Sequence, residues 1–377
     1  MRKKVLIVVN DPGFFLSHRL PIAIAARDSG YAVHIATSHD DKKTKTIESF
    51  GFTHHKIPLS RSGINIVTEI KTVFSIFAIF KKIKPALVHL VTIKPVLYGG
   101  IIARVRSVPS VVSAISGLGF VYGNHNGFLT RMIKGFSQLI YKLALSHSNQ
   151  HIIFQNQNDI TLLNKGQAEN ITLIPVSGVK LSEYPIRPEP KDQIVVSMAA
   201  RLLIDKGVLE FVEAAKILRN KGLGYKFQLI GSPDPHNPRT IKQDDITDWE
   251  EEGIIEYLGY RKDIAELFGA SSMVVLPSYY REGLPKVLIE AAACGRAVIT
   301  TNLPGCRDAV IPDTTGILIP HENALALASE IEHLAEDHQK RAAMGKAGRK
   351  MAEERFSIED VVAKHLDIYE DLLSKAS

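Results

Sequence analysis

Short apolar runs recur through the first half of the chain, and stretches with the apolar spacing of helices separate them. Runs of this length are typical of buried strands. Strands that alternate with helices predict a parallel, doubly wound sheet in an α/β fold. The strands that we expect are Val5–Val9, Ala32–Thr37, Ala86–Leu90, Val111–Ser113, Ile152–Phe154 and Thr172–Ile174.

The same pattern resumes after residue 193 and predicts a second doubly wound domain. Residues 181–193 between the two series carry three prolines and no apolar period, which is typical of an inter-domain linker. We therefore expect domains at 1–180 and 194–355, with a helix at 356–377 that crosses back to the first domain. The second series of expected strands is Val195–Ala199, Phe227–Ile230, Ile255–Leu258, Met273–Leu276, Ala297–Thr300 and Gly316–Ile319.

Two segments of the first half differ from ordinary sheet-covering helices. Residues 64–84 are apolar almost all round and end in lysines, and residues 127–145 carry leucine, isoleucine and phenylalanine on one face with basic residues opposite. Basic amphipathic helices of this kind are typical of membrane interfaces. The alternative is that both pack on the sheet as core helices. The scarcity of acids around them favours contact with an anionic membrane surface.

Composition and charge narrow the class of protein. A chain of 377 residues with 45% apolar and 23% charged residues exceeds one ordinary core and is typical of soluble globular proteins. Two cysteines fit a reducing cytosol, and no apolar run approaches the length of a membrane span. Residues 1–185 hold 22 basic and 9 acidic residues, a net charge of +13, whereas the remainder holds 24 and 31, a net of −7. This asymmetry indicates an anionic partner for the first half, either nucleic acid or a membrane surface.

Ligands of doubly wound sheets bind beyond the carboxyl ends of the strands. In the first half, the loops expected there begin at Asn10 and at His89 and continue through the glycine-rich stretch after Val111–Ser113. No G-x-G-x-x-G dinucleotide fingerprint is present. The candidate site residues of these loops are Gly13, His18, His89, Lys94, Ser116 and Gly117.

The stretch Pro277–Gly295 predicts a strand end, a tight loop and a helix. A helix start leaves free backbone N–H groups that can bind an anion. Glu282 and Glu290 flank this start, and each carboxylate can accept two hydrogen bonds from neighbouring hydroxyls, such as those of a sugar or a ribose. The alternative is ordinary α/β packing with two solvated glutamates.

Two cations follow the first strand of the second domain. Arg201 suits bidentate contact with a phosphate, and Lys206 adds a point charge. Both can reach one anionic group at the strand ends, although surface charges at a strand–helix turn would give the same pattern. The loop Gly231–Pro238 follows the next strand and is expected to border the same ligand.

The residues around 282–290 resemble family-4 glycosyltransferases, in which an E-x7-E pair lies within the context EGLP…EAAACG. The resemblance implies that Glu282 lies at the donor sugar and Glu290 at the ribose of a nucleotide-sugar, with Gly283, Leu284 and Pro285 near the sugar and diphosphate. It also implies that Arg201 and Lys206 bind the diphosphate and that Tyr260 and Arg261 lie near the base. In the first half, Gly13 is then the candidate for contact with the donor, and the candidates for the acceptor or its phosphates are His18, His89, Lys94, Ser116 and Gly117.

The motifs HLVTIKPVLYGG and SAISGLGFVYG extend the resemblance into the first half. They are similar to bacterial family-4 enzymes that extend lipid-linked oligosaccharides for O-antigen, capsule or protein glycosylation, and above all to α-1,3-N-acetylgalactosaminyltransferases that act on undecaprenyl-diphosphate-linked sugar. Many family members carry His where this chain has Ser116, so a role of that His cannot be transferred to this chain.

The resemblance implies a GT-B fold, with two Rossmann-like domains that face each other across a cleft. It further implies a retaining transfer of a hexose or N-acetylhexosamine, with N-acetylgalactosamine favoured, from a UDP-sugar to a polyprenyl-diphosphate-linked saccharide. We expect catalytic roles for Glu282, Arg201 and Lys206. Since the chain has no D-x-D motif, the cations can replace a bound metal, so we expect neither metal nor cofactor.

These expectations place the protein in the cytoplasm, peripheral on the inner face of the cell membrane. One alternative is a UDP-N-acetylhexosamine 2-epimerase of the same fold, which would need no lipid acceptor. A non-enzymatic nucleic-acid-binding protein is a second alternative, but the basic region lacks the signature of any nucleic-acid-binding fold, so we expect no nucleic-acid partner.

Overall fold

The computed structural model describes residues 2–59, 66–115, 139–155, 159–161, 170–174, 178–235, 237–280 and 283–376. The chain divides into two compact units. Unit 1 comprises Met1–Ser177 and Glu359–Ser377, and unit 2 comprises Gly178–Ile358. Each unit is a parallel sheet covered by helices, so the prediction of two doubly wound sheets is confirmed.

Unit 1 contains a seven-stranded sheet in the order β3-β2-β1-β4-β5-β6-β7. Every strand pair in it is parallel. The order reverses between β1 and β4, which makes the carboxyl ends of these two strands the topological switch point of the sheet. The strands are β1 (Lys4–Val9), β2 (Ala32–Thr37), β3 (Thr53–Lys56), β4 (Leu87–Val91), β5 (Ser110–Ile115), β6 (Gln150–Phe154) and β7 (Ile171–Leu173).

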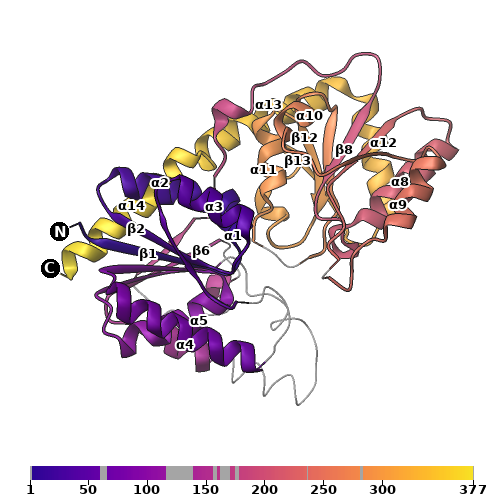
Figure 1. Ribbon diagram of the computed structural model, residues 1–377. Helices are drawn as coiled ribbons and strands as arrows, with labels where there is room; N and C mark the ends of the chain where they lie inside the picture. The colour runs from indigo at the N-terminus through magenta and orange to yellow at the C-terminus, as the bar shows by residue number, and fades with distance from the viewer. Residues whose placement is uncertain are drawn as a thin grey trace. The chain divides into compact units, whose positions relative to one another are not determined.

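Helices cover both faces of this sheet. In Figure 1, α4 and α5 lie on one face, and α2 and α14 lie on the other. Two helices follow β1 and meet at Arg19, where the backbone φ of −125° leaves the helical range. The helices of unit 1 are α1 (Pro12–His18), α2 (Leu20–Asp28), α3 (Asp41–Ser49), α4 (Ile66–Ile83), α5 (Ile93–Val105) and most of α14 (Ile358–Lys375).

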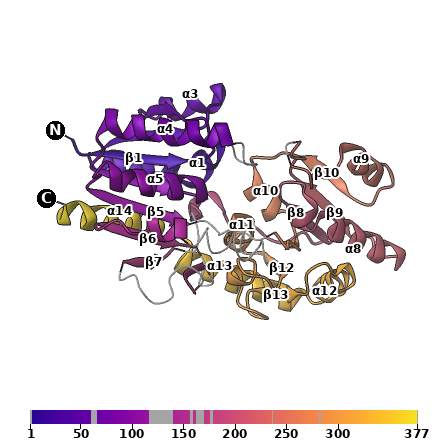
Figure 2. The same ribbon diagram turned by 90° about the horizontal axis from the view of Figure 1, so that it is seen from below.

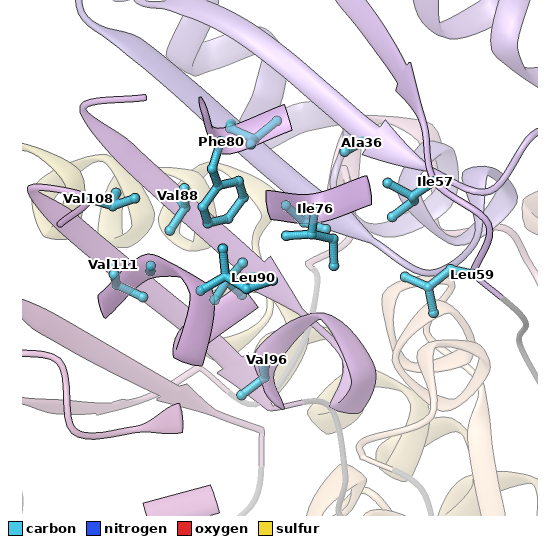
Figure 3. Close-up of a cluster of buried hydrophobic side chains, with 14 of the residues drawn as sticks. Ala36, Ile57, Leu59, Ile76, Phe80, Val88, Leu90, Val96, Val108 and Val111 are labelled. Atoms are coloured by element: carbon cyan, nitrogen blue, oxygen red, sulfur yellow. The ribbon is translucent and has the colours of Figure 1, made fainter. Parts of the chain in front are cut away.

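A hydrophobic cluster between the sheet and the pair α4 and α5 forms one layer of the core (Figure 3). Ile76 and Phe80 of α4 are buried against Val88 and Leu90 of β4. One face of α4 is therefore a core helix face, as the alternative reading of residues 64–84 predicted. The outer side of its first half is exposed instead, at Ile66, Val67, Ile70 and Phe74.

The C-terminal helix α14 lies on the opposite face of the same sheet. Its Tyr369 is fully buried and shares a hydrogen bond of 2.6 Å with Nδ1 of His89, and the carbonyl of Leu372 accepts a hydrogen bond from the Ser110 hydroxyl at 3.1 Å. The tail of the chain thus completes the core of unit 1.

Unit 2 contains a six-stranded parallel sheet in the order β10-β9-β8-β11-β12-β13. Its order reverses between β8 and β11, so the switch point lies at the carboxyl ends of those two strands. The strands are β8 (Val195–Ala199), β9 (Lys226–Ile230), β10 (Glu256–Gly259), β11 (Met273–Leu276), β12 (Ala297–Thr301) and β13 (Gly316–Ile319).

The helices of unit 2 pack in pairs: α12 contacts α8, and α13 contacts α11. Figure 2 shows α8 beside β8 and β9, and α12 beside β13. The elements are α8 (Val208–Asn220), α9 (Gln243–Glu251), α10 (Ile264–Gly269), α11 (Lys286–Ala293), α12 (Ala324–Glu336), α13 (His338–Arg355) and the 3₁₀ turns η2 (Leu181–Glu183), η3 (Ile204–Lys206) and η4 (Arg307–Ala309).

The proline-rich segment 181–193, expected to be a linker, lies within unit 2 and is held to its surface. Glu189 accepts a hydrogen bond of 2.7 Å from buried Arg341, and the Arg187 carbonyl accepts one of 2.6 Å from buried Arg296. Backbone and carboxylate groups here complete the hydrogen bonding of two guanidinium groups, which also donate to other carbonyl groups of unit 2.

One strand, β3, was not predicted from the sequence. β3 reads Thr-His-His-Lys and carries no apolar residue, because it is the edge of the sheet and is only half-buried. Among the helices that the structure describes, none combines the length and apolarity that a bilayer crossing requires.

Candidate functional site

The loops that follow β8 and β11 are joined at the switch point of unit 2. The carbonyl of Asp205 in η3 accepts hydrogen bonds from the amides of Tyr279 and Tyr280, both at 2.9 Å. Gly207 makes this approach possible: its φ is +80°, and a Cβ there would lie 2.3 Å from the Pro277 carbonyl oxygen. The turn after β8 and the loop after β11 therefore form one rigid edge.

Arg201 and Lys206 both lie on this edge. Arg201 Nη1 is 3.1 Å from Oδ2 of Asp234, which comes from the loop after β9. Lys206 is 7% exposed, and its ammonium lies 5.1 Å from the centre of the Tyr280 ring. A largely desolvated ammonium attracts an anion more strongly than a surface lysine does.

Glu290 projects from the second turn of α11 and is 13% exposed. The Tyr184 hydroxyl donates to its Oε1 at 2.6 Å, and Lys286 Nζ lies 3.4 Å from the same oxygen. Burial and the neighbouring Glu290 carboxylate raise the pKa of Tyr184, so the phenol stays protonated and donates. One carboxylate oxygen is thus fixed by the protein, which leaves Oε2 to accept from hydroxyls of a ligand.

Arg349 of α13 fixes Tyr184 in turn. Its Nη1 donates to the carbonyl oxygens of Tyr184 and Ala293, both at 2.6 Å. The carbonyl of Ala293 belongs to the last turn of α11, where a cation is favourable for the helix dipole. Arg349 therefore joins Tyr184 to the helix that carries Glu290.

The loop that precedes α11 is described from Gly283 onward. Leu284 is 8% exposed, and Pro285 is the N-cap of α11 with φ −64° and ψ 122°. Glu282, expected at the donor sugar, lies outside the described residues.

Tyr260 and Arg261 follow β10, the edge strand of unit 2. Tyr260 is 72% exposed, and Arg261 forms an ion pair with Asp263. Two strands separate β10 from β11, so these side chains begin farther from the switch point than Arg201 or Lys206 do.

In unit 1, Gly13 lies in the first turn of α1, directly after β1. The carboxylate of Asp11 caps this helix by accepting from the Phe14 amide at 2.8 Å, and a Cβ on Gly13 would lie 3.0 Å from Asp11 Oδ1. His18 ends the helix, stacks on Phe14 at 4.2 Å between ring centres and lies 2.6 Å from the Ser17 hydroxyl. Gly13 and His18 therefore lie on the carboxyl side of β1.

Lys94 is the second basic candidate of unit 1, and it has an acidic partner. Its Nζ lies 2.5 Å from Oε1 of Glu69, and the Tyr98 hydroxyl donates to Oε2 at 2.8 Å. Burial and the Glu69 carboxylate raise the pKa of Tyr98. Glu69 is the one acidic residue within 61–150, and it pairs with Lys94. The ion pair partly neutralises Lys94, so Lys94 attracts a phosphate less strongly.

The expectation for His89 is corrected. It lies within β4, is fully buried under α14, and its Nδ1 bonds to Tyr369. Burial and the nearby positive charge of Arg19 hold the pKa of His89 well below its usual value. His89 is buried as a whole residue and packs beneath α14, so it is a core residue. Ser116 and Gly117 lie outside the described residues.

Sequence reasoning missed Tyr184, Asp234 and Glu69 as partners of the site. Asp234 lies in the strand-end loop Gly231–Pro238 that was expected to border the ligand, so its position was a usable signal. Tyr184 lies 106 residues before Glu290, and no local pattern links the two. Within the described ranges, no group of three or more His, Cys, Asp or Glu side chains could hold a metal ion.

Comparison with known proteins identifies both halves of the chain. Residues 182–351 match the family "Glycosyl transferases group 1", and residues 4–156 match "Glycosyl transferase 4-like". The N,N′-diacetylbacillosaminyl-diphospho-undecaprenol alpha-1,3-N-acetylgalactosaminyltransferase of Campylobacter jejuni is 29% identical over 354 residues, which cover 88% of this chain and 91% of the relative. The capsular polysaccharide biosynthesis glycosyltransferase CapM of Staphylococcus aureus is 28% identical over 364 residues, covering 93% and 92%.

A solved structure of HepE from Anabaena, in complex with UDP, has the same fold with a TM-score of 0.77 at 19% identity, covering 98% of this chain and 100% of that one. The predicted GT-B class of two Rossmann-like domains is therefore confirmed. The two family models describe glycosyltransferases, and the two relatives named above are glycosyltransferases. The comparison therefore does not favour the epimerase alternative. The chain is therefore a glycosyltransferase, with a Glycosyl transferase 4-like domain at residues 4–156 and a Glycosyl transferases group 1 domain at residues 182–351.

Proposed function

We propose that this enzyme transfers a hexose or N-acetylhexosamine, with N-acetylgalactosamine favoured, from a UDP-sugar to a polyprenyl-diphosphate-linked saccharide in bacterial surface-glycan or glycoprotein assembly, with retention at the anomeric carbon. The observation that carries the proposal is the edge of unit 2, where Arg201, Lys206 and Glu290 follow the two strands of the switch point. Two cations and a carboxylate with one free oxygen match a diphosphate and a ribose diol.

The relatives support the chemical class of both substrates. HepE was solved with UDP, and the Campylobacter jejuni relative is named for a diphospho-undecaprenol acceptor and for the transfer of N-acetylgalactosamine. The match to that relative covers 88% of this chain, so it includes both units and not the nucleotide-binding half alone.

The proposed mechanism is a same-face displacement. The bond between the anomeric carbon and the UDP oxygen breaks, and the acceptor hydroxyl oxygen forms its bond on the same face of the sugar. The proton of that hydroxyl passes to the departing diphosphate. Arg201 and Lys206 stabilise the charge that develops on the diphosphate, with Gly283, Leu284 and Pro285 at the sugar and Glu282 beside it.

Metal independence is part of the proposal. A UDP leaving group gains negative charge in the transition state, and a metal ion or fixed cations can stabilise it. Arg201 and the largely buried Lys206 supply fixed positive charge at the switch point. We therefore expect transfer to persist in EDTA, and a loss of turnover that Mg²⁺ or Mn²⁺ restores would contradict this part.

We further propose that α4 places unit 1 on the anionic cytoplasmic face of the membrane, as a peripheral contact. Ile66, Val67, Ile70 and Phe74 are 72%, 61%, 52% and 69% exposed, and Lys71 lies among them. Apolar side chains of this kind enter the headgroup region while lysines contact anionic lipid. Residues 127–138 of the second predicted membrane segment lie outside the described residues.

A donor screen tests the proposed function. The purified enzyme is incubated with UDP-GalNAc, UDP-GlcNAc, UDP-Gal or UDP-Glc and a short polyprenyl-diphosphate disaccharide, and the extended product is identified by mass spectrometry. We expect one donor, UDP-GalNAc first, to give a product with an α linkage by NMR. Release of an epimerised UDP-sugar without acceptor would support the epimerase alternative instead.

Vesicle sedimentation tests the membrane contact separately. Ile70→Glu with Phe74→Glu should reduce binding to vesicles that contain 30% phosphatidylglycerol by about tenfold, because two apolar side chains are removed from the interface and two negative charges are added. Val105→Glu is the matched control, since Val105 is 68% exposed on α5 and lies outside the α4 patch. Equal loss in both variants would contradict docking through α4.

A further inference from the structure

Asn10 and Thr92 are neighbours at the switch point of unit 1. β1 and β4 pair in parallel register, with Val9 opposite Val91, and each strand ends there. Asn10 and Thr92 are the next residues of the two strands. They therefore occupy the place where doubly wound sheets bind their ligands.

Both side chains present buried polar atoms that have no partner. Oδ1 of Asn10 and Oγ1 of Thr92 are inaccessible to water and form no hydrogen bond within the described part of the chain. Thr92 is the N-cap of α5, a position where a threonine hydroxyl usually accepts from the helix, yet it forms no cap bond. Buried polar atoms are nearly always paired, so two adjacent orphans require an explanation.

The backbone of Thr92 is strained as well. Its φ is +73° and its ψ is 168°, a region that glycine adopts readily and that a β-branched residue rarely adopts. Strain of this kind clusters at ligand sites, where the surrounding structure holds it in place. At Thr92 the strain accompanies the missing cap bond to α5, one residue beyond the paired ends of β1 and β4.

The two orphan atoms define what they can bind. Asn10 Oδ1 can only accept a hydrogen bond, whereas the Thr92 hydroxyl can donate and accept. One hydroxyl of a ligand satisfies both, since it donates to Asn10 and accepts from Thr92. The pair carries no charge, and nearby Lys94 is paired with Glu69, so a diphosphate is a poorer match than a sugar hydroxyl.

We propose that Asn10 and Thr92 bind a hydroxyl of the terminal sugar of the acceptor saccharide and so select the acceptor. The inference rests on the proposed function, because it assumes a saccharide acceptor. The charged nucleotide-binding candidates Arg201, Lys206 and Glu290 belong to unit 2, whereas unit 1 contributes the donor candidate Gly13, which has no side chain. We therefore assign the uncharged pair in unit 1 to the second substrate. A site built to bond a hydroxyl rejects a sugar that lacks it.

The test compares isosteric variants of the full chain. Thr92→Val keeps the β-branched shape and removes the hydroxyl, and Thr92→Ser keeps the hydroxyl. We expect Thr92→Val and Asn10→Ala to raise the acceptor KM about tenfold with an unchanged donor KM, and Thr92→Ser to stay within about twofold of the wild type. The Tm of Thr92→Val should equal or exceed that of the wild type, because an unpaired buried hydroxyl is removed.

Thr72→Val is the matched control. The Thr72 hydroxyl is fully buried in the same unit and is bonded to the carbonyls of Pro58 and Thr68 at 2.8 and 2.9 Å. Its removal should lower the Tm and leave the acceptor KM unchanged. Thr92→Val should keep or raise the Tm and Thr72→Val should lower it. This difference distinguishes an unpaired hydroxyl that can bind a ligand from a hydroxyl that stabilises the fold.

Acceptors that lack one hydroxyl of the terminal sugar complete the test. For one of these deoxy acceptors, the wild type and Thr92→Val should have the same KM, because the contact is already missing. An unchanged acceptor KM in both Thr92→Val and Asn10→Ala, while the wild type transfers sugar, would overturn this inference alone. A rise in donor KM equal to that in acceptor KM would also overturn it, and a wild type that transfers no sugar would overturn the proposed function with it.

Discussion

The two units share one fold plan and differ at the switch point of the sheet. In unit 2, the loops after β8 and β11 carry Arg201, Lys206 and Glu290, and the charges of Arg201 and Glu290 are engaged by Asp234 and Tyr184. In unit 1, the ends of β1 and β4 carry Asn10 and Thr92, which are neutral and leave two buried polar atoms unpaired.

This difference shows how one architecture takes two kinds of ligand. The parallel sheet fixes where a ligand binds, and the side chains of the strand-end loops fix what it is. Fixed cations suit the diphosphate of a nucleotide-sugar, whose charge grows in the reaction. Neutral hydrogen-bonding groups suit saccharide hydroxyls, which carry no charge.

Removal of the charge of unit 2 should have the largest effect. The double variant Arg201→Ala and Lys206→Ala should lower kcat by at least about 10³-fold, because loss of a single charge-stabilising donor costs about 10²–10³-fold. Steady-state transfer with a saturating donor measures it. Lys350→Ala is the control, since Lys350 is exposed on α13 and paired with Glu354, and it should change kcat less than twofold. Unchanged transfer in the double variant would refute the proposed mechanism.

The cores of the two units should differ in acid sensitivity. Unit 1 buries His89 and His365, and burial together with the charge of Arg19 lowers the pKa of His365 to about 3 and that of His89 well below its usual value. Unfolded histidines titrate near 6.5. Below that pH the unfolded chain binds protons that the folded core excludes, so stability is full above about pH 6.5 and falls as the pH falls, by about 1.4 kcal/mol per pH unit for each histidine.

Trp249 makes this loss of stability measurable for each unit. It is the one tryptophan of the chain and lies in α9 of unit 2. On acid titration, hydrogen exchange in β4 and α14 should accelerate at a higher pH than that at which the Trp249 fluorescence changes. His365→Gln should reduce the pH dependence of exchange in β4. If β4 and α14 stay protected down to the pH at which Trp249 responds, the two cores do not differ in this way.

Loss of the Tyr184 hydroxyl should have a moderate effect. Tyr184→Phe frees Oε1 of Glu290 to turn, and UDP affinity should fall about five- to tenfold, the value of one hydrogen bond to a charged group. Calorimetric titration with UDP and with 2′,3′-dideoxy-UDP shows whether Tyr184 acts by positioning the Glu290 carboxylate or by supporting the fold. The loss of affinity should appear with UDP and be absent with the dideoxy ligand, whose ribose has no hydroxyls. An equal loss with both ligands would show that Tyr184 does not act through Glu290 on the ribose.

The smallest expected effect is a gain. Asp234→Asn removes the carboxylate that pairs with Arg201. UDP should then bind about two- to fivefold more tightly, because the Arg201 guanidinium no longer has to break an ion pair before it binds the diphosphate. The pair is partly exposed, which limits the gain. Glu353→Gln, which removes the partner of Arg349 Nε away from this edge, is the control and should leave UDP affinity unchanged. Weaker UDP binding in Asp234→Asn would show that Asp234 supports the site.

The sequence predicted most of the fold because parallel strands buried on both faces are apolar throughout. β2, β8, β11 and β13 lie where their apolar runs place them. The edge strand β3 carries histidines and a lysine and was missed for that reason. The apolar pattern of α4 favoured contact with a membrane surface. One face of α4 packs on the sheet and another exposes apolar side chains, and a linear pattern does not distinguish these two faces.

The candidate site was predictable where its residues are close in sequence. Arg201 and Lys206, like Gly283 and Glu290, lie within one loop and its helix, and strand-end position together with charge identified them. The partners Tyr184 and Asp234 come from distant segments and could not be found this way. His89 was misplaced because its motif spans a strand and the following loop, and only the packing of α14 decides which part is buried.

Hydrogen exchange with and without saturating UDP tests the central claim most directly, that unit 2 binds the nucleotide through its switch point while the switch point of unit 1 serves the acceptor. We predict protection at 200–207 and 277–290, with 88–95 unchanged until a polyprenyl-diphosphate saccharide is added. Protection by UDP at 88–95 without change at 200–207 would contradict the account.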